Sequence, residues 1–85
     1  MDVRRIVGRN LRRLRLERGL SQEALAHDAE IAPSYLSQIE SGKRSPTVTL
    51  LQGLATVLRT PITEFFAEGK SASPKGLPRG RRTRK

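Results

Sequence analysis

Apolar residues recur every three or four positions along the first part of the chain. The residues on this spacing are Val3, Ile6, Val7, Leu11 and Leu14. Such spacing is typical of one face of an amphipathic helix. Arg15 stands at the edge of this apolar stripe, and Gly19 follows as a C-terminal stop. The pattern predicts a helix over about 2–18.

Two short helices are predicted next, over about 22–28 and 33–41. Ser21 is a good N-cap for the first of them, whose residues Leu25 and Ala26 are expected to face inward. Pro33 suits the first position of the second helix, because its missing N–H has no partner there in any helix. Gly42 suits the position just past the end of that helix.

The remaining apolar residues predict a fourth helix over about 47–58 and a short fifth helix over about 61–66. Leucines and valines form the stripe of the fourth helix, and Pro61 begins the fifth. No stretch alternates apolar and polar residues as a strand would. The sequence therefore predicts an all-α fold with one compact domain, 1–66. Residues 67–85 mix Gly, Pro, Ser and like charges, and are predicted to form a disordered basic tail.

The segment 33–41 has an unusual polar face. At 100° per residue, Leu36 and Ile39 point inward, whereas the outward positions hold only small or uncharged polar groups: Ser34, Ser37, Gln38 and Ser41. Lys43 and Arg44 follow directly. A face of hydrogen-bonding groups beside basic residues fits a partner with negative charge and with donors and acceptors on its edges, as double-stranded DNA has.

The net charge agrees with a polyanionic partner. The chain carries 17 Lys and Arg and 8 Asp and Glu, a formal charge of +9 with a pI near 11.5. This balance favours nucleic acid first and anionic membrane second. Residues 67–85 hold seven basic residues and one Glu. That tail either is a solvated end or adds sequence-independent affinity for phosphates, whereas lipid binding is less favoured because no amphipathic helix accompanies it.

The composition argues against several classes of protein. There is no cysteine and only one histidine, His27, so neither a disulfide framework nor a multi-histidine metal site is expected. No catalytic constellation or glycine-rich phosphate loop is present, and an enzyme is not expected. We expect no cofactor, metal or small-molecule ligand. No run approaches the roughly 20 apolar residues of a membrane span, and the N-terminus has no secretory signal, so a soluble cytoplasmic protein is expected.

Two longer stretches, LRLERGLSQEALA and SYLSQIESGKRSPTVTLLQGLA, resemble the lambda-repressor-like, Xre/Cro-type helix-turn-helix family. The resemblance covers about residues 6–66 and rests on several linked positions. It implies five helices, of which the second and third bind DNA, with the third as the recognition helix in the major groove.

The resemblance also implies roles for individual residues. Gln22 matches a contact to the DNA backbone, Tyr35 the rim of the base contacts, and Lys43 and Arg44 a phosphate-binding loop. The full DNA-binding set is Ser21, Gln22, Pro33, Ser34, Tyr35, Ser37, Gln38, Lys43 and Arg44. For Tyr35, packing is an equal alternative.

Two further positions match the family and two depart from it. Arg15 and Glu40 match a structural ion pair between the first and third helices. Glu30 stands where the family usually has glycine, and Ala32 stands where a Ser or Thr commonly caps the third helix. A non-glycine residue in a left-handed turn is strained, and a lost cap costs about 1 kcal/mol.

The expected function is that of a prokaryotic-type transcription regulator, a repressor or an activator, that binds a near-palindromic operator as a homodimer and so resides on the nucleoid. One recognition helix contacts too few bases to select a genomic site, and a dimer on a two-fold site doubles the number of bases contacted. The expected interface is formed by Leu58, Ile62, Phe65 and Phe66, although both phenylalanines could instead close the monomer core. The alternative function is an antitoxin or another protein-interaction module that uses DNA binding for autoregulation.

Overall fold

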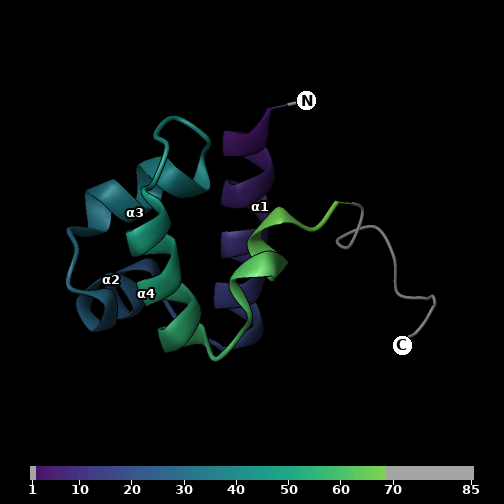
Figure 1. Cartoon of the computed structure of the whole chain (residues 1–85). Coiled ribbons are helices and arrows are strands. Elements are labelled where there is room, and N and C mark those ends of the chain that lie inside the picture. The colour runs from purple at the N-terminus through teal and green to yellow at the C-terminus, as the bar shows by residue number, and fades with distance from the viewer. Residues whose placement is uncertain (1, 69–85) are drawn as a thin grey trace.

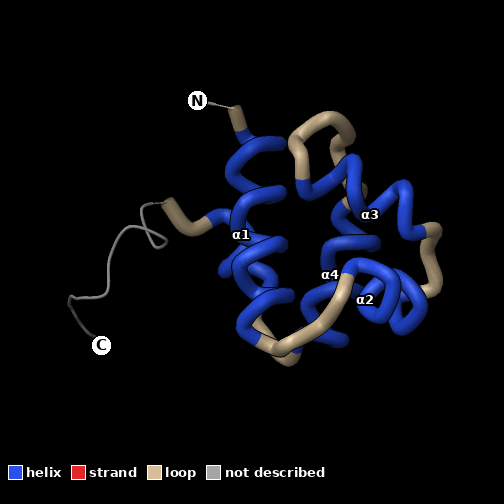
Figure 2. The backbone as a smooth tube through the Cα atoms, turned by 180° about the vertical axis from the view of Figure 1, so that it is seen from behind, coloured by secondary structure: helices blue, strands red, loops and turns tan. Residues whose placement is uncertain are grey.

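Four α-helices and one short 3₁₀ helix make up the described part of the chain (Figure 1). The computed structural model describes residues 2–68. Its elements are α1 (Val3–Glu17), α2 (Gln22–Ala29), α3 (Pro33–Glu40), α4 (Val48–Leu58) and the 3₁₀ helix η1 (Ile62–Phe66). Within residues 2–68 there is no strand (Figure 2). The predicted all-α class is confirmed, whereas all but two residues of the predicted tail, 67–85, lie outside the described residues.

The four predicted α-helices agree with the observed ones to within one residue at each end. The fifth predicted helix is a single 3₁₀ segment, in which the Glu64 amide donates to the Pro61 carbonyl at 3.0 Å. A 3₁₀ helix is favoured in short pieces of this kind. The described domain therefore has four α-helices rather than five.

Local signals in the sequence explain where the helices begin and end. The Ser21 hydroxyl accepts from the Ala24 amide at 3.0 Å, and the Thr47 hydroxyl accepts from the Leu50 amide at 3.0 Å. Both bonds satisfy amides that have no partner inside the helix. After α1 and α3 the chain turns at Gly19 (φ 71°) and Gly42 (φ 81°), where only glycine avoids strain.

The core is a cluster of buried apolar side chains contributed by every element. Leu58 and Phe65 are fully buried in the single chain, so in this conformation neither can form the predicted interface with a second copy. Phe65 closes the monomer core, which was the alternative for that residue. Val3, predicted to lie in the apolar stripe of α1, is 52% exposed instead because it occupies the first residue of the helix.

Gly8 allows α1 to lie directly against the end of α3. A Cβ atom at this position would lie 2.4 Å from the Ile39 carbonyl oxygen and 2.6 Å from the Glu40 carbonyl oxygen. Both neighbours are backbone atoms, which cannot rotate away. The close packing of α1 on α3 therefore requires glycine at position 8, a requirement that the apolar pattern did not reveal.

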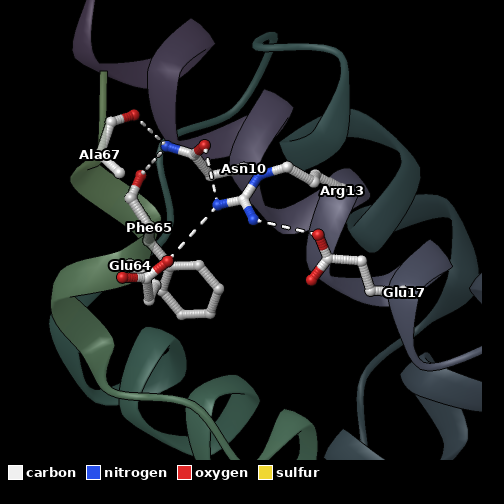
Figure 3. Close-up of polar contacts among 6 residues, drawn as sticks. All are labelled: Asn10, Arg13, Glu17, Glu64, Phe65 and Ala67. Atoms are coloured by element: carbon white, nitrogen blue, oxygen red, sulfur yellow. Dashed lines mark hydrogen bonds and ion pairs between the residues drawn. The ribbon is translucent and has the colours of Figure 1, made fainter. Parts of the chain in front are cut away.

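A polar anchor joins α1 to η1 (Figure 3). The side-chain amide of Asn10, which is 1% exposed, donates to the carbonyl oxygens of Phe65 at 2.9 Å and Ala67 at 2.7 Å. Arg13 extends the contact with ion pairs to Glu17 at 3.3 Å and Glu64 at 3.6 Å. The bond to Phe65 gives a buried carbonyl its donor, and the two Asn10 bonds together join α1 to the end of η1 and the residue after it.

Candidate nucleic-acid interface

Helix α3 separates its apolar and polar side chains cleanly. Leu36 and Ile39 are fully buried in the core. On the opposite side lies what we call the polar face, formed by the exposed residues Ser34, Ser37, Gln38 and Ser41. One side of the helix therefore packs on the core, and the opposite side exposes a row of neutral hydrogen-bonding groups to solvent.

The turn between α2 and α3 confirms both departures from the family pattern. Glu30 adopts a left-handed conformation, with φ 62° and ψ 42°. Ala32 is the N-cap of α3 and makes no side-chain capping bond. Pro33 follows in the first turn and has no amide that needs a partner. The helix entry is thus built without glycine in the turn and without a polar cap.

A buried ion pair links α1 to α3 beneath the polar face. The Arg15 guanidinium donates to both carboxylate oxygens of Glu40, at 2.7 Å from Nε and 3.0 Å from Nη2. The two side chains are only 8% and 4% exposed. A third contact comes from α2, where Gln22 Nε2 donates to Glu40 Oε1 at 3.0 Å. The predicted pair is present, and together with Gln22 it links α1, α2 and α3.

A second cluster lies beside the polar face, on the side of Gln38. The Arg44 guanidinium lies over the Tyr35 ring, 5.0 Å from its centroid. Arg44 Nε also donates to Gln38 Oε1 at 2.7 Å. This cation–π contact and hydrogen bond bring a residue of the following loop back onto α3. The sequence placed these three residues near one another but did not predict their mutual contacts.

The nine predicted DNA-binding residues lie together in space. They occupy the start of α2, the outside of α3 and the loop that follows α3. All are exposed except Gln22 and Tyr35, which are half-buried through their contacts with Glu40 and Arg44. Whether each residue touches DNA stays a prediction, but the geometry places all nine around one helix.

Other kinds of site have little support in the part of the chain that the structure describes. Within residues 2–68, no three His, Cys, Asp or Glu side chains are grouped so that they could hold a metal ion. None of the helices in this range has the length and apolar character needed to cross a membrane.

Comparison with known protein families and sequences gives one consistent result. A family profile described as "Helix-turn-helix" matches residues 11–65. The HTH-type transcriptional regulator y4dJ of Sinorhizobium fredii is 47% identical over 65 residues, which are 76% of this chain and 84% of that protein. The HTH-type transcriptional regulator RamB of Mycobacterium tuberculosis is 51% identical over 61 residues, which are 72% of this chain but only 13% of RamB.

The fold is also similar to that of solved structures. The restriction-modification controller protein C.AhdI of Aeromonas hydrophila superposes with a TM-score of 0.72 and 36% identity. The match covers 74% of this chain and 96% of C.AhdI. The match to y4dJ and to C.AhdI therefore extends over most of each protein, whereas in RamB it is confined to a small part.

Proposed function

The chain belongs to the helix-turn-helix family of DNA-binding transcription regulators, and we propose that it recognises a near-palindromic operator as a homodimer. The similar proteins y4dJ and RamB are named as HTH-type transcriptional regulators. In this proposal α3 enters the major groove and its polar face meets the edges of the bases, while α2 crosses the sugar-phosphate backbone.

The polar face of α3 is the observation that carries the proposal. The Gln38 amide can pair with adenine by accepting from N6 and donating to N7. Its Oε1 already accepts from Arg44, but a carbonyl oxygen has two lone pairs and can accept a second bond. Arg44 thus orients the amide in advance of DNA binding. The serines can donate or accept, so they add contacts but little discrimination between bases.

Contacts to the DNA backbone would come from the start of α2 and from the loop that follows α3. Lys43 and Arg44 follow α3 and are exposed, as cations that bind phosphate must be. Ser21 and Gln22 stand at the start of α2, where helix amides and the positive end of the helix dipole favour a phosphate. These contacts set the register of α3 in the groove without selecting a sequence.

An exposed apolar patch at one end of the domain supports the homodimer. Phe66, from the predicted interface, is 46% exposed, and it lines a hollow of about 140 Å³ together with Val3 and Val48. Val48 is 73% exposed. Ile62, also from the predicted interface, is partly exposed but does not line this hollow. A second copy covering this patch would remove apolar surface from water and double the number of bases read.

Regulation would follow from occupancy of the DNA. A dimer bound over a promoter excludes the transcription machinery, so we propose that the protein is a repressor, with its own promoter as one candidate target. Such a role places it in the cytoplasm, on the chromosome.

A binding measurement with two duplexes tests this proposal. Fluorescence anisotropy would compare the DNA upstream of the protein's own gene with a scrambled duplex, across a series of salt concentrations. We expect tight binding to the first duplex only. The double substitution Ser37→Ala/Gln38→Ala should weaken that binding by about 5- to 150-fold, because a good bidentate contact contributes ~1–3 kcal/mol of discrimination.

A matched variant on another helix controls for the loss of polar groups. Gln52 and Thr56 are an exposed amide and an exposed hydroxyl on α4, and Gln52→Ala/Thr56→Ala should leave the affinity unchanged. Equal binding to both duplexes that neither variant alters would contradict the proposed role of α3 on these sequences.

A further inference from the structure

Arg12 occupies the side of α1 that faces the outer edge of α3. Gly8 lies against the last residues of α3, and Arg12 comes one helical turn later on the same side of α1. There it borders a hollow of about 290 Å³ whose lining residues come from three helices: Arg12, Arg15, Gln22, Ser37, Glu40 and Ser41. Arg12 is thus a neighbour of the polar face, although it is distant from it in sequence.

The hollow has the chemistry of an anion site. Ser37 and Ser41 line it with hydroxyl groups, of which that of Ser41 already donates to the Gln38 carbonyl at 3.1 Å, and Arg12 is an exposed arginine. Arg12 forms no ion pair with any residue in the range 2–68. The one carboxylate present, Glu40, already accepts from Arg15 and Gln22. An incoming anion would therefore meet a cation whose charge is not balanced by a neighbour among these residues.

The hollow lies across α3 from the other basic group. Arg44 contacts Tyr35 and Gln38 on one side of the helix, whereas Arg12 borders Ser37 and Ser41 on the other. At 100° per residue, the pair Tyr35 and Gln38 and the pair Ser37 and Ser41 fall on opposite sides of Ser34, the centre of the polar face. The polar face is therefore flanked by a guanidinium on each side.

A helix seated in the major groove has a sugar-phosphate backbone on each side of it. We infer that Arg12 binds a phosphate of the backbone on the α1 side of the groove, opposite the phosphate bound by Lys43 and Arg44. The hollow is the phosphate subsite, with the Ser37 hydroxyl as an additional donor. This assignment rests on the proposed function, since it requires α3 to be in the groove.

The salt dependence of DNA binding tests the assignment. Each phosphate contact adds about 0.9 to the slope of log K against log salt concentration. For the full chain on a duplex that the wild type binds, Arg12→Ala should reduce the slope by about 1 and weaken binding roughly five- to tenfold near 0.1 M salt, whatever the sequence of the duplex. Arg12→Lys keeps the charge and should keep the slope.

Arg9 provides the matched control. It is an exposed arginine on the same helix and forms no ion pair within residues 2–68. It shares a second hollow with Arg12, Leu16 and Glu17, but it does not line the hollow beside Ser37. Arg9→Ala removes the same charge and should leave the slope nearly unchanged. Circular dichroism of all three variants would verify that their helix content equals that of the wild type.

The possible failures are distinguishable. If the wild type binds DNA and Arg12→Ala has the same slope and affinity as Arg9→Ala, the phosphate subsite is wrong and the proposed function stands. If the wild type binds neither the upstream duplex nor the scrambled duplex, the proposed function fails and the subsite fails with it.

Discussion

Replacing Glu40 by alanine is expected to lower the free energy of unfolding by about 3–5 kcal/mol. The loss arises because the substitution leaves the Arg15 guanidinium, 8% exposed, without its carboxylate partner. Gln22 loses its acceptor in the same step. Since small domains have a total stability of about 5–15 kcal/mol, the effect should be large in urea unfolding monitored by circular dichroism.

Glu17 offers a control in the same helix bundle. It also forms an ion pair, with Arg13, but its side chain is 58% exposed. Glu17→Ala should therefore cost at most about 0.5 kcal/mol, as is usual for exposed pairs four residues apart on a helix. The double substitution Arg15→Met/Glu40→Leu, which removes both charges, should recover most of the stability lost in Glu40→Ala. Equal losses in Glu40→Ala and Glu17→Ala would contradict the structural role of the buried pair.

The second large effect is expected at Gly8. Gly8→Ala should destabilise the domain by about 1–3 kcal/mol, although alanine favours helix formation by about 1 kcal/mol relative to glycine. The added Cβ would meet two backbone carbonyl oxygens of α3 closer than van der Waals contact allows. Relief requires α1 and α3 to separate. The change is measurable as a lower midpoint of urea unfolding.

Gly53 gives the same substitution without the clash. It lies inside α4, and a Cβ there would meet no atom within 4 Å apart from its chain neighbours and the backbone of its own helix. Gly53→Ala should therefore stabilise the domain by roughly 0.5–1 kcal/mol through helix propensity alone. Stabilisation by both substitutions would show that the close approach of α1 and α3 is not rigid.

The positions of the helices were predictable from the sequence because local rules determine them. Ser21 and Thr47 cap the helices that follow them, and Gly19 and Gly42 supply the left-handed turns. The buried positions of α3, Leu36 and Ile39, follow from helical periodicity alone. The buried Arg15–Glu40 pair needed the family resemblance, since the spacing by itself placed each residue only at the edge of a stripe.

The features that were missed depend on how the helices approach one another. Gly8 and Asn10 are not among the apolar positions of α1, yet one permits contact with α3 and the other binds the carbonyls of Phe65 and Ala67. No periodicity encodes either role. The burial of Phe65 likewise depends on where η1 packs, and the sequence could not distinguish a core position from an interface.

The candidate site was predictable only in part, because some of its contacts also depend on how the helices approach one another. The outward residues of α3 follow from its period, and the basic loop follows from chain order. The placement of Arg12 beside Ser37 and the contact of Arg44 with Tyr35 arise only when α1, α3 and the loop pack together. The surroundings of the polar face are thus a property of the fold.

The most direct measurement is the selection of bound duplexes from a random DNA pool, followed by sequencing. For the wild type we expect one enriched motif with two inverted half-sites. For Gln38→Ala we expect the same motif with the preference for adenine lost at one position in each half-site. The absence of any enriched motif, or an identical motif for the variant, would contradict the claim that α3 reads the operator.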